Sequence, residues 1–151
     1  MDLSTSLQVI IPFGIFQGPT MRREKNGQKL LSVSLVAHAI KLEELAHALG
    51  DTPCAPRTAC LGLFFGPTVV GYRDFVDAIG LDLERALLGG HEITFARPFK
   101  ADEPVRAEMT MVDHQEKNGM EIGVFETRFT TPAGEAIQTQ RTTFIERARK
   151  A

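Results

Sequence analysis

The sequence predicts an α+β domain in which one antiparallel sheet wraps around a single apolar helix. Two observations lead to this fold class. Residues 66–80 are largely apolar with helical spacing, and four segments that alternate apolar and polar residues follow them towards the C-terminus. The 151 residues can bury the core of one such domain and are too few for two ordinary domains.

The composition excludes several classes of function. Hydrophobic residues make up 43% of the chain and charged residues 24%, which is typical of a globular protein. The net charge of −2 and the pI near 6.1 provide no broad basic field for nucleic acid or for acidic lipid. The apolar segment 9–16 contains Pro12 and Gly14 and is too short to span a bilayer. We therefore expect a cytoplasmic protein without a membrane segment and without a nucleic-acid partner.

The chain contains two cysteines, Cys54 and Cys60. Structural zinc needs four ligands, and this pair has no second pair to join. A cysteine-poor sequence also fits the reducing conditions of the cytoplasm. We expect neither a metal site nor a cofactor.

Short segments with different periods make up the first part of the chain. Asn26-Gly27 is a hairpin-type dipeptide, because both residues tolerate positive φ. It could join a strand near residues 20–24 to a strand at residues 30–38. Residues 41–49 place their leucines at helical spacing and predict a short helix that ends at a glycine.

The apolar segment 66–80 predicts the central helix. Pro67 suits its first turn, and the valines that follow make the helix apolar enough to be buried. Gly71 would let another backbone approach this helix closely. A second short helical stretch is expected at residues 81–88, directly before two glycines.

The second half of the chain changes to the two-residue period of half-buried strands. The turn-rich sequences KADEP, QEKNG and PAGE separate these strands, and consecutive strands with short connections form an antiparallel meander. A single apolar helix wrapped by one antiparallel sheet is the hotdog arrangement, although the periodicity alone leaves other α+β folds open. The four predicted strands are residues 91–99, 105–114, 120–131 and 136–147.

Four segments, taken in their order and spacing, carry a resemblance to a known family. They are LEELAHALGD, FGPTVV, GLDLERALLGGHEITFARPFKADEP and GVFETRFTTPAGEAIQTQRTTFI. From Leu35 to Arg147 the chain resembles the MaoC-like hotdog family. Within that family it is most similar to the N-terminal, non-catalytic half of two-part (3R)-hydroxyacyl-thioester dehydratases, the FAS1-like dehydratase domain. We expect a single MaoC-like hotdog domain over residues 31–151, preceded by an N-terminal arm or hairpin over residues 1–30.

The resemblance implies a catalytic signature, Asp-x-Asn-x-x-His, after the first helix. In the family its aspartate and histidine activate water and exchange protons with the carbon next to the thioester. Here Asp51 matches the aspartate, whereas Pro53 and Pro56 stand where the asparagine and histidine are expected. Proline has neither a titratable side chain nor a backbone N–H, so this chain is expected to lack the catalytic pair.

Three other groupings could carry chemistry, and each also has a simpler structural explanation. His47 lies four residues before Asp51, so the two could form a displaced catalytic pair or an ordinary surface ion pair. Cys54 could be a nucleophile with His47 as its base, or a partly buried loop thiol. Some hotdog thioesterases carry a carboxylate on the central helix, which makes Asp74 and Asp77 candidates. A helix face that meets solvent or a partner explains the same two charges.

The start of the central helix is the predicted binding site for the thioester carbonyl. A helix N-terminus presents free backbone N–H groups that stabilise developing negative charge. Pro67 has no N–H, so Thr68 and Val69 are the expected donors. The predicted substrate-binding residues are Gly66, Thr68, Val69 and Tyr72. Basic residues near a later turn could attract a CoA or carrier-protein phosphate, or could be ordinary surface charges. These residues are Arg97, Lys100 and Arg106.

Three functions are compatible with the sequence. The first is an acyl-thioester-binding subunit of a MaoC-like (3R)-hydroxyacyl-CoA or acyl-carrier-protein dehydratase, which in reverse is an enoyl-thioester hydratase. Such a subunit would form a homodimer, or a heterodimer with a catalytic MaoC-like chain, because a single hotdog exposes a sheet edge. The second is a homodimeric acyl-CoA thioesterase. The third is a non-enzymatic acyl-thioester-binding protein.

Overall fold

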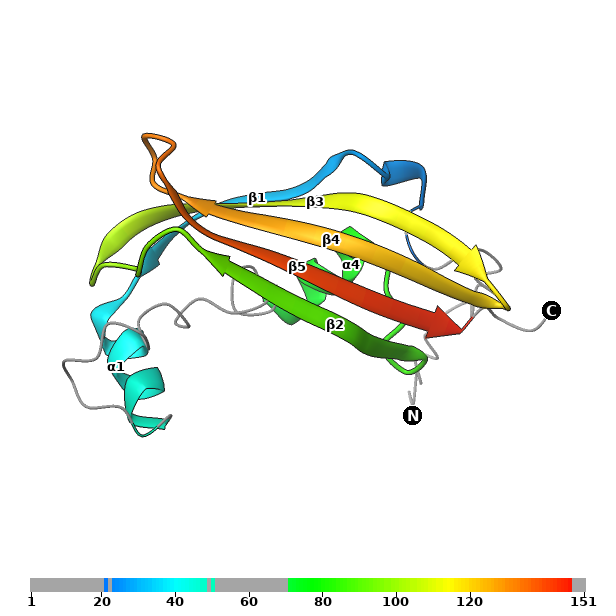
Figure 1. Cartoon of the computed structure of the whole chain (residues 1–151), viewed down its shortest axis with the longest axis horizontal. Coiled ribbons are helices and arrows are strands. Elements are labelled where there is room, and N and C mark those ends of the chain that lie inside the picture. Colours follow the sequence, from blue (N-terminus) through cyan, green and yellow to red (C-terminus); the bar gives the residue numbers. More distant parts are fainter. Residues whose placement is uncertain (1–20, 22, 49, 51–70, 148–151) are drawn as a thin grey trace, which may run out of the picture.

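A computed structural model describes residues 21, 23–48, 50 and 71–147 of the chain (Figure 1). Within these residues a five-stranded sheet is accompanied by two α-helices and one short 3₁₀ turn. The helical elements are η1 (Arg23–Lys25), α1 (Ala39–Ala48) and α4 (Tyr72–Ile79). The strands are β1 (Lys29–Ala37), β2 (Ala86–Phe95), β3 (Glu103–Lys117), β4 (Met120–Thr130) and β5 (Ala136–Arg147).

The sheet has the strand order β1-β3-β4-β5-β2, and every neighbouring pair is antiparallel. The expected meander is therefore confirmed for β3, β4 and β5, but the expectation that β2 continues it beside β3 is wrong. β1 already occupies the edge of β3, with Leu35 opposite Val105. The remaining edge is that of β5, and β2 pairs there with His91 opposite Thr142.

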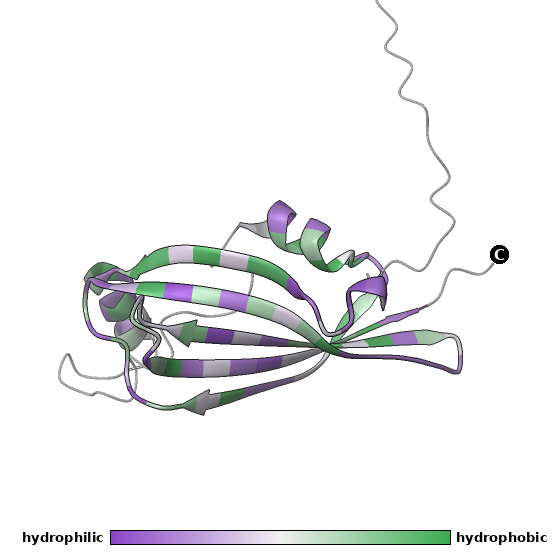
Figure 2. Ribbon diagram, turned by 90° about the horizontal axis from the view of Figure 1, so that it is seen from above, coloured by the Kyte–Doolittle hydropathy of each residue, from purple (hydrophilic) through white to green (hydrophobic). Residues whose placement is uncertain are grey.

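α4 lies on one side of the sheet (Figure 2). The two faces of the sheet differ in polarity, since buried and less buried residues alternate along β3, β4 and β5. On the face turned away from α4, opposite charges stand next to one another across the strands. Glu126 of β4 is opposite Arg141 of β5, and Arg141 is in turn opposite Glu92 of β2. Cross-strand pairs of this kind suit a solvated face, so this side of the sheet has the composition of an outer surface.

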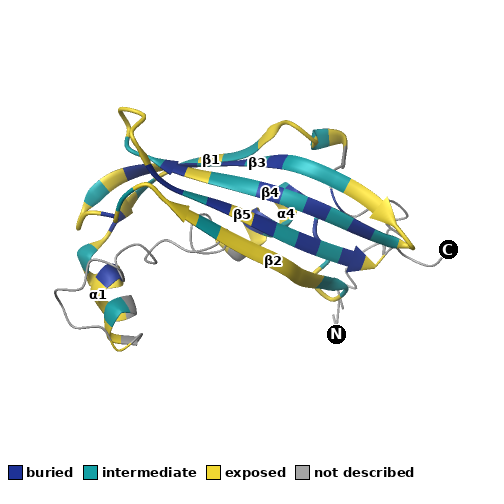
Figure 3. Ribbon diagram, in the orientation of Figure 1, coloured by how far each residue is buried: buried dark blue, intermediate teal, exposed yellow. Residues whose placement is uncertain are grey.

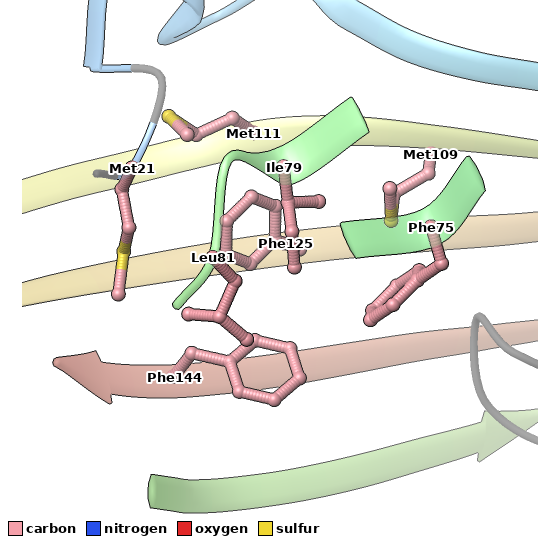
Figure 4. Packing of buried hydrophobic residues seen from close by; sticks show 8 residues of the cluster. All are labelled: Met21, Phe75, Ile79, Leu81, Met109, Met111, Phe125 and Phe144. Carbon is pink, nitrogen blue, oxygen red and sulfur yellow. The ribbon is translucent and has the colours of Figure 1, made fainter. Parts of the chain in front are cut away.

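The side that faces α4 holds the main hydrophobic core (Figure 4). Phe75 and Ile79 of α4 and Leu81, which follows the helix, pack against methionines of β3 and aromatic side chains of β4 and β5. The ring of Phe144 lies 6.1 Å from that of Phe75 and 6.0 Å from that of Phe125. The predicted burial of the central helix against the sheet is confirmed. The buried members of this cluster are Met21, Phe75, Ile79, Leu81, Met109, Met111, Phe125 and Phe144.

Gly123 lets this core close over β4. A β-carbon at Gly123 would lie 2.7 Å from the sulfur of Met21 and 2.9 Å from a ring atom of Phe125, closer than van der Waals contact allows. Met21 is in turn held by its backbone N–H, which donates to a carboxylate oxygen of Glu121 at 3.3 Å. The glycine is therefore required here for close packing rather than for a turn.

A second hydrophobic cluster joins α1 to the other end of the sheet. Leu42 of α1 packs with Phe99, Phe129 and neighbouring apolar residues, and the rings of Phe99 and Phe129 meet edge to face at 6.0 Å. The helix start is fixed by Asp102, whose carboxylate accepts a hydrogen bond from the N–H of Ala39 at 3.0 Å. α1 thus depends on contacts with the turn before β3 for its position.

The expectation of a strand near residues 20–24 is wrong. Residues 23–25 form the 3₁₀ turn η1 instead. The turn predicted at Asn26-Gly27 does occur, because Gly27 has a φ of 80° and the N–H of Gln28 donates to the carbonyl of Lys25 at 2.8 Å. The N–H of Gly27 also donates to the carbonyl of Met111 at 2.7 Å, so this turn is bonded to β3 rather than to a strand of its own.

The expected helix at residues 81–88 is also wrong. Residues 83–85 form a turn in which the N–H of Arg85 donates to the carbonyl of Asp82 at 3.0 Å, and β2 begins at Ala86. The side chain of Arg85 pairs with Glu146 on β5, which brings this segment to the sheet edge. Tertiary pairing here outweighs the local helical preference of the sequence.

The central helix begins later than the sequence predicts. α4 starts at Tyr72, and its N-cap residue Gly71 has a φ of 90° and a ψ of 151°, which are not helical angles. The described residues place no atom within 4 Å of a β-carbon built on Gly71, so none of them makes the expected close backbone approach at this position. The positive φ is what favours glycine here.

Within the described residues, no helix is long and apolar enough to cross a membrane.

Candidate functional site

Most of the predicted site lies outside the described residues. This applies to the signature loop, including Asp51 and Cys54, and to the predicted carbonyl site at Gly66, Thr68 and Val69. The absence of the catalytic pair therefore stays a prediction from the sequence. The residues of the predicted site that the structure does describe are His47, Tyr72, Asp74 and Asp77.

His47 is exposed in the last turn of α1, and its carbonyl accepts a hydrogen bond from the N–H of Gly50 at 3.1 Å. This bond ends the helix at a glycine with a φ of 75°, as the sequence predicts. The pairing of His47 with Asp51 stays a prediction. The exposed position of His47 agrees both with a displaced catalytic pair and with an ordinary surface ion pair.

Asp74 and Asp77 are exposed on α4, whereas Phe75 of the same helix is buried against the sheet. Tyr72 is the first residue of the helix, and Asp74 lies in its first turn. The backbone N–H groups of a first helical turn have no acceptor within the helix. The first turn of α4, residues 72–74, therefore presents free backbone N–H groups. A thioesterase role for the two aspartates stays a prediction.

Arg97 is not available as a free phosphate-binding cation. Its guanidinium lies 2.9 Å from Glu103 and 2.9 Å from Glu135, and it donates to the carbonyl of Pro98 at 2.8 Å. Hydrogen bonds to Glu103 and Glu135 raise the pKa of Arg97 above its ordinary value. Burial alone would raise the pKa of Glu103, but its hydrogen bonds from Arg97 and from the N–H of Lys100 lower it overall. Arg97 therefore ties the β2–β3 connection to the turn before β5.

Lys100 and Arg106 are both exposed. Lys100 uses its backbone N–H to bind Glu103 at 2.6 Å. A role of these two side chains in attracting a phosphate stays a prediction.

The structure reveals a group of side chains that the sequence does not indicate, on the helix-facing side of β2 and β5. Most of β2 is exposed (Figure 3). Its exposed residues Leu88, His91 and Phe95 share the helix-facing side of the sheet, and we call them the inner strip. Next to them on β5 stands a row of buried polar side chains, the polar row. The polar row consists of Gln138, Gln140 and Thr142, which are 2%, 2% and 8% exposed.

Hydrogen bonds order the polar row and join it to the inner strip. Nδ1 of His91 lies 2.9 Å from the hydroxyl oxygen of Thr142, across the β2–β5 pair. The side-chain amide of Gln140 donates to the amide oxygen of Gln138 at 3.1 Å. Thr142 is opposite Phe125, a member of the core under α4, which establishes that all these residues face the helix side.

A β-bulge at Gly89 and Gly90 places His91 on this side. The pairing of β2 with β5 shifts by one residue between Leu88 and Gly90, so that Leu88 and His91 both face the helix despite their odd separation. Without the bulge His91 would point to the outer, charged face. A pair of glycines directly before a histidine in a strand is the one signal in the sequence that could have indicated this arrangement.

Partial burial favours the neutral form of the His91 imidazole. Burial lowers the pKa of His91 below its ordinary value of 6.5, because removal of water disfavours the charged form. A neutral imidazole has one nitrogen that donates and one that accepts a hydrogen bond. The inner strip therefore combines two apolar side chains with an uncharged polar group between them.

A buried ion cluster closes the other end of the helix-facing side. Glu146 is fully buried, pairs with the guanidinium of Arg85 and accepts a hydrogen bond from the N–H of Asp82 at 3.1 Å. Arg85 also binds the carboxylate of Asp82 at 2.9 Å. Burial opposes the charge of Arg85, yet the hydrogen bonds that its guanidinium donates to Glu146 and Asp82 raise the pKa of Arg85 overall. This cluster holds the start of β2 against β5.

Solved structures with the same fold include several dehydratases. The MaoC-like dehydratase from Rhodospirillum rubrum is 16% identical with a TM-score of 0.55, and the match covers 83% of this chain and 94% of that one. The HadBC (3R)-hydroxyacyl-ACP dehydratase complex from Mycobacterium tuberculosis is 17% identical with a TM-score of 0.53, covering 80% and 97%. The ChsH1–ChsH2 complex from the same organism is 12% identical with a TM-score of 0.58, covering 81% and 87%.

The sheet wrapped around α4 and these structural matches define a hotdog protein of the α+β class, as the sequence predicts. Residues 34–140 match the family described as the FAS1-like dehydratase domain region. Because this match spans most of the chain, the protein belongs to that family. The resemblance to MaoC-like dehydratases is confirmed. No curated protein sequence matches the chain.

Proposed function

We propose that this protein is the acyl-thioester-binding subunit of a MaoC-like (3R)-hydroxyacyl-thioester dehydratase and that a second chain supplies the catalytic aspartate and histidine. The family and the fold support the thioester substrate class. Pro53 and Pro56 at the signature positions support the loss of catalysis in this chain. Two of the structural matches are complexes with two-part names, HadBC and ChsH1–ChsH2, which agrees with a division of labour between chains.

The observation that carries the proposal is the exposed edge strand β2. It is ten residues long and stands last in the described sheet, beyond β5. Leu87 is 70% exposed and Leu88 is 57% exposed, and they face opposite sides of the sheet. A long edge strand with apolar side chains on both faces is a template for pairing with another chain. A partner chain at β2 would cover both leucines and close the helix-facing side of the sheet.

In such an assembly the two chains have different roles. The partner's aspartate and histidine activate the water and move the proton at the carbon next to the thioester. The apolar helix and sheet of this chain contribute a wall for the acyl group, and the first-turn N–H groups of α4 are candidates to bind the thioester carbonyl. The substrate is a CoA or carrier-protein thioester of a 3-hydroxyacyl group, and the reaction releases water to form the enoyl thioester.

A test of assembly follows from the β2 edge. The wild-type chain, co-expressed with a MaoC-like chain that retains Asp-x-Asn-x-x-His, is expected to co-purify as a complex. Leu87→Lys and Leu88→Lys should weaken that association at least about tenfold, because a charge replaces a buried apolar contact. Light scattering coupled to size exclusion gives the stoichiometry. Ile40→Lys is the matched control, because Ile40 is 63% exposed on α1. Folded β2 variants that bind as tightly as the control variant would contradict an interface at β2.

A further inference from the structure

One end of the sheet reverses the usual alternation of its side chains. A sheet that is covered on one side normally turns apolar residues inward and polar residues outward. At this end the buried residues are Glu121 and Glu146, whereas their sequence neighbours Ile122 and Ile145 face away from α4 and stand opposite each other. We call the apolar side chains on this outer face of β4 and β5 the outer band. It consists of Ile122, Val124 and Ile145.

The outer band is open to a partner. Its three members are all partly exposed, and the band continues to Leu87 of β2, which is opposite Ile145 and 70% exposed. A β-carbon at Gly89 would lie 2.8 Å from Cδ1 of Ile145, so the glycine leaves room for this side chain over β2. An exposed apolar surface that is bordered by charged residues is typical of a protein–protein contact.

The charged residues that border the outer band stand in one row, which we call the charged row. Glu126 of β4 is opposite Arg141 of β5, one outward position along β4 from Val124. Arg141 is exposed, and none of the ion pairs among the described residues includes it. Glu126 uses Oε1 to bind Arg128 at 2.8 Å, which leaves Oε2 for a second cation. Both members of the row can therefore bind an opposite charge on another chain.

The outer face is complementary to itself about one axis. β4 and β5 lie side by side along their length (Figure 1). A two-fold axis that runs between them, parallel to the strands, places β4 of one copy over β5 of a second copy. Glu126 of each copy then faces Arg141 of the other, and Ile122 faces Ile145. An axis across the strands through the charged row would instead set Arg141 against Arg141, which like-charge repulsion disfavours.

We propose that the outer band and the charged row form an interface at which two copies of this chain pack back to back. Packed sheets keep their strand directions within about 30° of each other, so the axis between β4 and β5 gives an arrangement that sheets adopt. The contact lies on the face of the sheet, whereas a partner at β2 extends the sheet at its edge. Both contacts can form together, and a complex with the catalytic chain then contains two copies of each chain.

Sedimentation velocity of the full chain over a range of concentrations tests the proposal. We expect the wild type to form a pair of copies. Ile145→Lys should weaken this self-association at least about tenfold, because it places a charge in an apolar contact. Ser34→Lys is the matched control, because Ser34 is exposed on the outer side of β1, opposite Arg106 and away from the line between β4 and β5. It should leave the dissociation constant unchanged.

Reversal of charge tests the orientation of the two copies. In Arg141→Glu each copy sets a new carboxylate against Glu126 of the other, and in Glu126→Arg each sets a new guanidinium against Arg141. Either variant alone should self-associate at least about tenfold more weakly than the wild type. A mixture of the two variants places opposite charges at both contacts and should restore association. Circular dichroism confirms that each variant is folded.

The outcomes separate this surface from the β2 edge. Leu88→Lys, on the helix-facing side of β2, should leave the self-association of the chain unchanged. A wild-type chain that stays a single copy would overturn the proposal. A pair that is lost in Leu88→Lys and kept in Ile145→Lys would also overturn it, as would a mixture of the two charge variants that associates no better than either alone. Each of these results leaves the heterodimer at β2, and with it the proposed function, intact.

Discussion

Replacing Phe125 with alanine is expected to lower the free energy of unfolding by about 4 kcal/mol, within the range for emptying a buried phenylalanine site. Phe125 is 2% exposed on β4, and its ring packs 6.0 Å from that of Phe144. It also fills the space above Gly123, where Met21 closes the core. The loss has two parts, the lost transfer of the ring from water and the cavity that remains between α4 and the sheet.

Chemical denaturation followed by circular dichroism measures this change. Phe125→Leu should cost less, about 1.5 kcal/mol, because leucine keeps much of the volume. Ile40→Ala is the surface control and should stay within about 0.5 kcal/mol, since Ile40 is 63% exposed. If Phe125→Ala costs no more than Ile40→Ala, the packing of α4 on this face of the sheet is wrong.

Arg85→Met is expected to destabilise the fold by about 3 kcal/mol, because it leaves the buried carboxylate of Glu146 without its cation. Glu146 is fully buried, whereas the side chain of Arg85 is 25% exposed. Water can therefore partly reach the position that the arginine leaves. The expected loss of folding free energy is for this reason at the lower end of the range for a broken buried ion pair. The segment that begins β2 should loosen first, since Arg85 holds it to β5.

Two further variants identify the cause of this loss. Arg128→Met removes a cation from an exposed pair with Glu126, in which Arg128 is 72% exposed, and should change stability by no more than about 0.5 kcal/mol. Glu146→Gln should destabilise the wild type but stabilise the Arg85→Met variant, because it removes the uncompensated negative charge. If Glu146→Gln destabilises both the wild type and the Arg85→Met variant, or stabilises both, Arg85 and Glu146 do not form a buried, charged pair.

The sequence identifies the elements of the fold more securely than their arrangement. The alternating residues of β3, β4 and β5 and the apolar residues of α4 predict strands and a buried helix, and both are found. Residues 81–88 have a helical pattern but form a turn and the start of β2, because Arg85 is drawn to Glu146. Periodicity states which face of a strand is apolar, but it does not state which edge of the sheet the strand joins. The position of β2 beyond β5 therefore depended on the three-dimensional structure.

The candidate site could be predicted only in part for a related reason. The signature positions at Asp51, Pro53 and Pro56 are adjacent in sequence, so a local pattern indicates them. His91 and Thr142 are 51 residues apart and meet only through the register of β2 and β5. Glu146 likewise resembles a surface residue in an alternating strand and proves to be fully buried. Long-range pairs of this kind leave no local signal.

The central claim is that this chain binds the thioester and leaves the chemistry to a partner. The most direct measurement is the hydration of crotonyl-CoA and longer enoyl-CoA thioesters by the purified chain alone and by its co-expressed complex with a MaoC-like chain that retains Asp-x-Asn-x-x-His. We expect no turnover by the chain alone. The complex should be active and lose at least about a hundredfold in rate when the signature histidine of the partner is replaced. Robust turnover by the pure single chain would contradict the claim.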